Sequence, residues 1–266
     1  MTVVKKIYLG VILFFLYAPI IVLMVFSFNS SQSMATWEGF TLDWYRALLN
    51  NREVRRALEN TLLIGVFSTL IATTIGTAAA VGLDRLGRKS KKVIISVSSL
   101  PVMMPDIVTG ICLMMLYHFV IRSIGRGQLG FNTLLLSHIM FNVPYVILCV
   151  MPKLRTIDPN LYEAALDLGS RPLRAFVKVI LPEIWPGVVT GAMLAFTLSV
   201  DDFMVSFFTT GPGVENLSIL IFSMTRVGIN PMINALSTLI FMATLLLLTI
   251  IYLRDRRANK KKEELQ

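Results

Sequence analysis

Three carboxylates interrupt otherwise apolar stretches of the sequence: Asp106, Asp201 and Asp202. A charged side chain at the centre of a bilayer costs about 2.5–3.5 kcal/mol on an insertion scale, so acids in such stretches are candidates for function. Carboxylates in a poorly hydrated lumen attract cations, and their chemistry therefore fits a path for positively charged molecules. The aromatic faces of Tyr117 and Phe203 could add cation–π contacts, although packing against lipid or core is the alternative for either ring.

The two adjacent acids have different expected surroundings. If residues 187–210 form one helix, a polar stripe of three- and four-residue spacing runs along it: Ser199, Asp202, Ser206 and Thr209. The stripe predicts that Asp202 faces the path, whereas Asp201, about 100° away, bonds to neighbouring groups. The alternative is that the helix ends earlier and both acids are solvated at an outer mouth. Asp106 follows Pro105, and a broken helix at membrane depth is tolerated where it lines a cavity.

No other combination of residues predicts bond-making chemistry. His118 and His138 lie in different apolar segments without a carboxylate partner set, so a satisfied hydrogen bond is favoured over a metal site. The two cysteines each lie inside an apolar segment and argue for neither a disulfide framework nor a metal site. We therefore expect no catalytic residues and no metal ligands. Gly187 and Gly191 have the spacing of close helix packing.

The composition places these residues in a membrane protein. The 266-residue chain is 55% hydrophobic and 15% charged, against about 45–50% and about 25% in soluble domains. A bilayer core needs about 20 apolar helical residues. Runs of that order cover residues 7–28, 61–83, 93–121, 131–152, 187–210 and 232–253. The sequence predicts an all-α integral membrane protein with six transmembrane helices, in which residues 1–266 form a single domain.

Basic residues set the expected orientation, because loops on the cytoplasmic side retain Lys and Arg. With the N-terminus inside, 18 of the 25 Lys and Arg fall on the inner side and 7 on the outer side. Both termini are therefore expected to be cytoplasmic. The net charge of +9 follows from this topology and requires no nucleic acid partner. The run 7–28 is too long for the apolar region of a signal peptide and is interpreted as an uncleaved first span.

The inner loop 153–186 predicts two short amphipathic helices joined at a sharp turn. Asp158 can cap the first helix with Pro159 at its first position, and Gly169 ends it. Its apolar face consists of Leu161, Ala164, Ala165 and Leu168. Ser170 can cap the second helix, which Pro182 is expected to end. Such helices can lie on lipid, but the narrow alanine-rich face and the acidic Glu163 favour a protein groove.

The string EAALDLGSRPLRAFVKVILPEIWPG, residues 163–187, resembles the EAA motif of ABC importer permeases. Glu163-Ala164-Ala165, Gly169 and Ile180-Leu181-Pro182 carry the resemblance. In that family the loop forms a coupling helix that sits in a cleft of a separate cytoplasmic ATPase. The resemblance therefore implies that Glu163, Ala164, Ala165, Leu168 and Gly169 couple the chain to that ATPase. It also implies that ATP and magnesium bind to the ATPase, so that no cofactor is expected in this chain.

Five further segments resemble the spermidine/putrescine permeases that pair with a second permease: residues 27–32, 39–51, 104–111, 194–213 and 223–238. The resemblance implies the type I ABC importer permease fold in a bacterial inner membrane. The implied partners are a second permease, two ATPase subunits, an extracytoplasmic polyamine-binding protein and membrane lipid. An importer of another small cationic or metal-chelate substrate is the alternative. A self-sufficient secondary transporter or channel is disfavoured, since such a protein does not need a loop that binds a separate ATPase.

Overall fold

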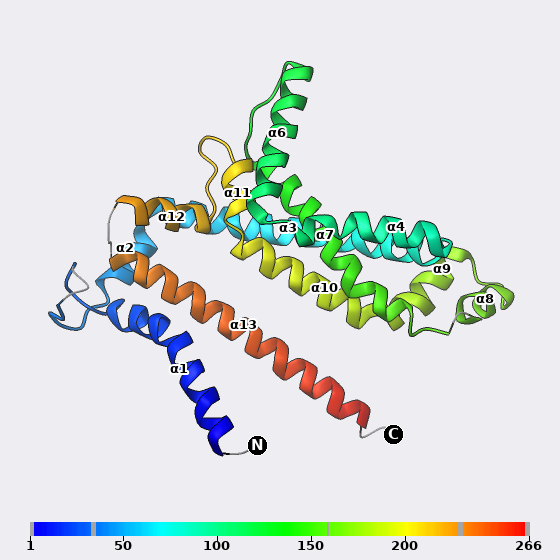
Figure 1. The fold of residues 1–266 in the computed structure, drawn as a ribbon, viewed down its shortest axis with the longest axis horizontal. Coiled ribbons are helices and arrows are strands. Elements are labelled where there is room, and N and C mark those ends of the chain that lie inside the picture. The colour runs from blue at the N-terminus through cyan, green and yellow to red at the C-terminus, as the bar shows by residue number, and fades with distance from the viewer. Residues whose placement is uncertain (1–2, 33–35, 159, 228–230, 264–266) are drawn as a thin grey trace. The chain divides into compact units, whose positions relative to one another are not determined.

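The computed structural model describes residues 3–32, 36–158, 160–227 and 231–263. The described residues are almost entirely helical (Figure 1). The α-helices are α1 (Val3–Phe26), α2 (Asp43–Asn50), α3 (Arg52–Asp84), α4 (Arg88–Ser98), α5 (Leu100–Met103), α6 (Asp106–Ile124), α7 (Phe131–Leu154), α8 (Asn160–Asp167), α9 (Pro172–Ala175), α10 (Leu181–Asp201), α11 (Met204–Thr209), α12 (Leu217–Val227) and α13 (Pro231–Glu263). One π-helical turn, η1 (Phe176–Ile180), joins α9 to α10.

The chain divides into two compact units, of which the first comprises residues 1–55 and 221–266. Within it, α13 packs against α2 and against α1. The segment after α1 is held by side-chain hydrogen bonds: Ser27 Oγ lies 2.6 Å from Tyr45 Oη, and Trp44 Nε1 donates to the carbonyl of Asn29 at 2.7 Å. The apolar part of α1, Ile7–Phe26, buries none of its side chains within the structure. That exposure fits a helix surrounded by lipid or by another protein.

The second unit, residues 56–220, has a core of three packed helices, α3, α7 and α10. Glycines allow these helices to approach closely. A Cβ added at Gly76 on α3 would lie 2.7 Å from Val146 Cβ on α7. A Cβ at Gly187 on α10 would lie 2.9 Å from the Cys149 carbonyl oxygen on α7, and Gly191 meets the same helix at 3.3 Å. The expected close packing at Gly187 and Gly191 is confirmed.

Five helices of the described residues are long and apolar enough to cross a membrane: Ile7–Phe26, Arg52–Asp84, Asp106–Ile124, Phe131–Leu154 and Pro172–Asp201. They correspond to the first five predicted runs. The sixth run, 232–253, lies on α13, whose described apolar stretch is Pro231–Leu246. Most side chains beyond Leu246 lie outside the described residues, so the sixth span stays a prediction.

Two of the predicted spans contain more than one helix. The break beside Pro105 in the run 93–121 was expected from its prolines and is confirmed, whereas the main interpretation of the run 187–210 as one helix was wrong. The run 93–121 is divided into α4, α5 and α6, with Met104 extended (φ −85°, ψ 148°) before Pro105. A residue before proline is pushed out of the helical region, which explains the break. The run 187–210 is divided into α10 and α11, because Asp202 is extended (φ −66°, ψ 129°). Only α6 and the continuous stretch ending at Asp201 retain spanning length.

Candidate functional site

The break between α10 and α11 is capped by the side chain of Asp202. Its Oδ1 accepts the backbone N–H of Val205 at 3.2 Å, and its Oδ2 accepts both the N–H and the Oγ–H of Ser206 at 2.7 Å. A carboxylate at the start of a helix satisfies amides that lack helical partners and opposes the helix dipole. The Asp202 side chain is 8% exposed. The Asp202 carboxylate is thus used mainly for hydrogen bonds to Val205 and Ser206 at the start of α11.

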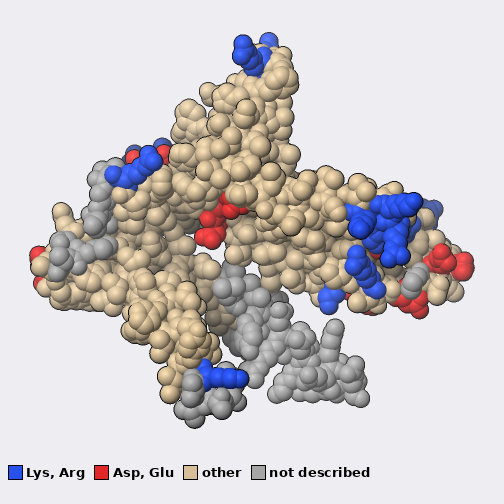
Figure 2. Space-filling view, in the orientation of Figure 1, with Lys and Arg blue, Asp and Glu red and all other residues tan. Residues whose placement is uncertain are grey.

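A cavity of about 370 Å³ opens at this break. It is lined by Pro101, Asp106, Thr109, Phe141, Tyr145, Thr197, Leu198, Asp201, Asp202, Phe203, Met204 and Val205. Asp106, the first residue of α6, and Asp201, the last of α10, are both exposed. In Figure 2 acidic side chains form a patch where α10 ends. Among its described lining residues there is no Lys, Arg or His, so the cavity combines carboxylates with aromatic rings.

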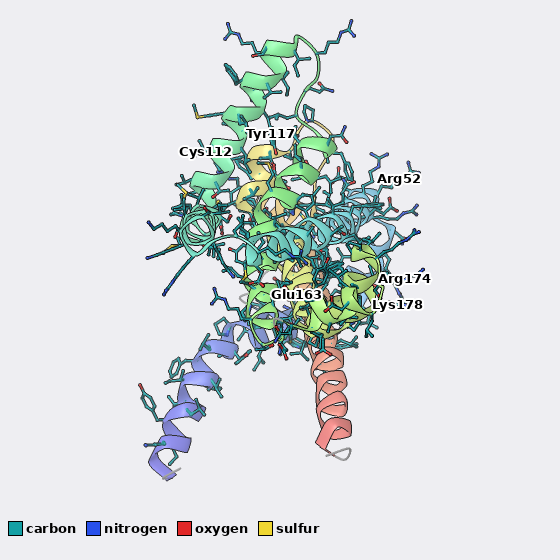
Figure 3. All side chains as sticks on the ribbon, turned by 90° about the vertical axis from the view of Figure 1, so that its right-hand side faces the viewer. Arg52, Cys112, Tyr117, Glu163, Arg174 and Lys178 are labelled. Atoms are coloured by element: carbon teal, nitrogen blue, oxygen red, sulfur yellow. The ribbon has the colours of Figure 1, made fainter. Side chains whose placement is uncertain are left out.

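The structure brings together most of the residues expected to line a cation path. Asp106, Asp201, Asp202 and Phe203 all line this cavity. Tyr117 does not line it: the ring is 6% exposed, and its Oη lies 2.9 Å from Ser137 Oγ in the core between α6 and α7. Figure 3 shows Tyr117 on α6.

Asp201 and Asp202 both line the cavity, but their side chains differ in exposure and hydrogen bonding. Asp202 is turned inward and hydrogen-bonded, whereas Asp201 is exposed. No hydrogen bond to the Asp201 carboxylate is found within the described residues. The interpretation from the sequence depended on one continuous helix, and the break at Asp202 changes the direction of every later side chain. Even so, Ser199, Ser206 and Thr209 of the expected stripe are all buried.

Beneath the cavity lies a buried polar network that connects four elements. His138 on α7 is fully buried, with Nδ1 2.5 Å from Ser199 Oγ and Nε2 3.0 Å from Ser206 Oγ. Ser199 Oγ lies 2.8 Å from Ser68 Oγ on α3. Asn216, after α11, donates from Nδ2 to Ser206 Oγ at 2.8 Å. The interpretation of His138 as a hydrogen-bonded residue is confirmed.

Sequence reasoning missed the rest of this network. It found no carboxylate near His138, yet Asp202 Oδ2 lies 3.7 Å from Nε2. The partners are separated from His138 by 61 residues for Ser199 and 68 for Ser206, so no local spacing links them. The one available signal was the occurrence of polar residues in apolar runs. Such residues in a membrane segment are expected to find each other.

At the other end of α10, the inner loop forms the predicted sharp turn. Asp158 Oδ1 accepts the N–H of Asn160 at 2.9 Å as α8 begins; Pro159 lies outside the described residues. The last turn of α8 closes with the N–H of Ser170 donating to the Ala165 carbonyl at 3.2 Å and that of Gly169 to the Leu166 carbonyl at 2.8 Å. Gly169 has φ +81°. This is the Schellman arrangement with glycine at its left-handed position, and the predicted stop at Gly169 is confirmed.

The second half of the loop differs from the prediction in two ways. Arg171, and not Ser170, occupies the position before α9, and it makes no side-chain cap. Pro182 does not end the helix. In η1 the N–H of Leu181 donates to the carbonyl of Phe176, five residues back, so the helix widens by one residue immediately before Pro182. A wider turn accommodates a residue that lacks an N–H and would otherwise crowd the preceding turn.

Several apolar side chains of the loop are left uncovered. Leu168 is 87% exposed and Leu173 76% exposed, while Glu163 and Ala164 are also exposed. Of the predicted apolar face, Ala165 alone is buried, at 9% exposure. Figure 3 looks onto this end of the unit, where Glu163, Arg174 and Lys178 are labelled. The face offered outward is small, apolar and bordered by charge.

A cation–π contact joins the inner loop to the residue after α3, beside an ion pair that connects the end of α3 to α4. The guanidinium of Arg85 lies 4.2 Å from the ring centroid of Tyr162, a cation–π contact. Lys91 Nζ lies 2.6 Å from Asp84 Oδ1 beside it. A cavity of about 640 Å³ lies between these residues and the start of α8, and Glu163 is part of its lining.

Comparison with known proteins identifies the family. Residues 72–261 match the family described as binding-protein-dependent transport system inner membrane component. The chain is 42% identical over 246 residues to the spermidine/putrescine transport system permease protein PotC of Escherichia coli (strain K12), covering 92% of this chain and 91% of the relative. It is 38% identical over 250 residues to the putrescine transport system permease protein PotI of the same strain, covering 93% and 89%.

The fold agrees with this relationship. A chain from the crystal structure of a bacterial ABC transporter involved in the import of alginate superposes with a TM-score of 0.71 at 18% identity, covering 93% of this chain and 92% of that one. The all-α permease fold expected from the sequence is therefore confirmed. The chain belongs to the family of inner membrane components of binding-protein-dependent transport systems.

Proposed function

We propose that the chain is a transmembrane permease subunit of an ATP-driven importer of polyamines. The observation that carries the proposal is the cavity at the end of α10, where Asp106 and Asp201 offer exposed carboxylates among aromatic rings. Polyamines are flexible chains with several ammonium groups joined by short apolar spacers. Carboxylates can pair with the ammonium groups, and rings such as Phe203 can cover the spacers or make cation–π contacts. The names of the relatives support the same substrate class.

In this proposal the three acids have different roles. Asp201 and Asp106 are free to meet a substrate, because both are exposed in the cavity. Asp202 adds its charge from behind, since its oxygens already accept three hydrogen bonds from Val205 and Ser206. In a partly hydrated cavity each carboxylate lowers the barrier to a polycation. Tyr117 has a packing role in this proposal.

We further propose that the inner loop docks on a separate ATPase. Leu168, Leu173 and Ala164 leave an apolar face exposed next to Glu163, and a protein groove would bury it. Residues 153–186 are then the coupling segment of one permease domain, residues 1–266. ATP and magnesium act on the ATPase, with two ATPase subunits, a second permease and an extracytoplasmic polyamine-binding protein completing the importer. Docking and undocking of α8 would move α10, to which it is joined through α9 and η1.

The proposed orientation places both termini in the cytoplasm. The charge distribution supports it: 18 of 25 basic residues fall in the segments assigned to the inside. In Figure 2 many of the visible basic side chains gather over α4, at the end of the second unit that also carries α8. The ATPase would approach that end.

Uptake by the reconstituted importer tests the function. Complexes containing the wild-type chain should accumulate labelled putrescine or spermidine in proteoliposomes when ATP is supplied, and Asp201→Asn should raise the KM for uptake. The matched control is Glu215→Gln, which neutralises an exposed carboxylate of the same unit outside the cavity lining. Uptake of a different cation or a metal chelate in place of polyamines would favour the alternative substrate class. Equal KM values for Asp201→Asn and wild type would contradict the assignment of the cavity.

A further inference from the structure

His138 lies across the break in the fifth span, with one ring nitrogen on each side of it. Nδ1 meets Ser199, in the last turn of α10, and Nε2 meets Ser206, in α11. We infer that His138 is a positioning residue that sets the angle between α10 and α11 and so the shape of the acidic cavity. The inference rests on the proposed function, in that it assigns how the substrate cavity is held.

The hydrogen bonds around the imidazole have a defined direction. The single proton of Ser206 Oγ goes to Asp202 Oδ2, while Asn216 Nδ2 donates to that Oγ. Nε2 therefore has to donate to Ser206, because no proton remains there for it to accept. A neutral ring with its proton on Nε2 then accepts at Nδ1 from Ser199. Both ring nitrogens of His138 are then hydrogen-bonded, and Ser206 links Nε2 to the Asp202 carboxylate.

Local backbone structure alone leaves this break loosely determined. Asp202 is extended, so the regular helical ladder stops between α10 and α11. Side-chain bonds take over: Asp202 caps α11, and His138 ties both helices to α7. The ring centroid of His138 also lies 5.2 Å from that of Phe141, which lines the cavity. Asp201 and Phe203 flank the capping residue Asp202, so their placement follows from the same bonds.

Substitutions of His138 distinguish a role in positioning the cavity residues from a role in folding alone. His138→Ala removes both bonds and should raise the KM for polyamine uptake about 5–20-fold, with the maximal rate changed less than about twofold in assembled complex. His138→Gln places an amide near the Nε2 position and His138→Asn near Nδ1, so each should recover part of the lost affinity. The control is His118→Gln, since His118 is exposed and bonds only to the carbonyl of Met114 on its own helix.

Equal KM increases in the Ala, Gln and Asn variants would overturn the inference. So would an unchanged KM accompanied by a lower yield of assembled complex, because that pattern denotes a purely structural role. Failure of wild type to take up either polyamine would contradict the proposed function and not this inference, which then depends on a second measurement.

That measurement is the rate of thiol labelling at Met204→Cys, in a chain whose Cys112 and Cys149 are replaced by alanine. Met204 lines the cavity as the first residue of α11. His138→Ala should raise the labelling rate by a methanethiosulfonate reagent at least about threefold by loosening the break. Thr109→Cys, on the α6 side of the same cavity, should be labelled at an unchanged rate. An unchanged rate at Met204→Cys would refute the positioning role.

Discussion

Gly169→Ala is expected to weaken the end of α8 without any steric clash. Gly169 has φ +81°, and a Cβ added there would meet no atom within 4 Å. The cost is therefore that of the left-handed backbone for an L-residue, about 1–2 kcal/mol. Since 1.4 kcal/mol is a factor of ten, the intact helix end should lose about 5–30-fold in population relative to frayed forms. Hydrogen exchange of the Gly169 and Ser170 amides, which donate into the last turn, should speed up correspondingly.

The control for this prediction is Gly82→Ala. Gly82 lies in α3, also has open space around a Cβ, and lacks a positive φ. Alanine there should stabilise the helix by about 0.5–1 kcal/mol. We expect Gly169→Ala to weaken ATPase binding and to reduce ATP-dependent uptake in the reconstituted complex, while Gly82→Ala does neither. If the two variants bind the ATPase and transport equally well, the shape of this turn does not matter for coupling, and the reasoning is refuted.

The remaining predictions concern the cavity, the core and the topology. Asp202→Asn keeps the size of the cap but replaces one accepting oxygen with an NH2 group, which cannot accept a hydrogen bond from Val205 or Ser206. The free energy of unfolding in detergent should therefore fall by about 1–3 kcal/mol, whereas Asp201→Asn should leave it unchanged; equal melting curves would contradict the capping role. Gly187→Ala should destabilise the chain by about 1–3 kcal/mol, because its Cβ would lie 2.9 Å from a backbone carbonyl oxygen of α7, with Gly10→Ala, in open space, as the control. A reporter fused after Gln266 should be active only if it is of the cytoplasmic type; activity of a periplasmic-type reporter would contradict the proposed orientation.

The sequence was sufficient for the features that depend on local chemistry. Apolar run length predicted the helical membrane class, and the glycine after a short amphipathic run predicted the stop at Gly169. Each of these signals is carried by neighbouring residues, and the energy that enforces it is also local. The spacing of Gly187 and Gly191 likewise predicted a close helix contact, since only the absence of a side chain is needed.

The missed features have two origins: contacts between distant segments, and local backbone solutions that have no simple sequence signal. No proline or glycine marks the break at Asp202 in the sequence. The break is stabilised by the Asp202 side chain, which accepts hydrogen bonds at the start of α11. His138 finds its partners only after α7, α10 and α11 have packed. At Pro182 the general rule that proline ends a helix was applied, but a π-helical turn provides another solution that sequence alone does not reveal. Tertiary packing decided the partners of His138, whereas the break at Asp202 and the turn before Pro182 use local hydrogen bonds that the sequence pattern did not reveal.

The turn η1 has a consequence for building chimeric permeases. Because each residue advances a helix by about 100°, the one extra residue in this turn fixes the angular phase between α8 and the residues at the far end of α10. Removing a residue between Gly169 and Asp201 would change the direction of Asp201 relative to the exposed Leu168. Pro182 would then crowd a regular α-turn. A loop grafted from another permease should therefore preserve the number of residues between these two positions, even where its sequence is free to change.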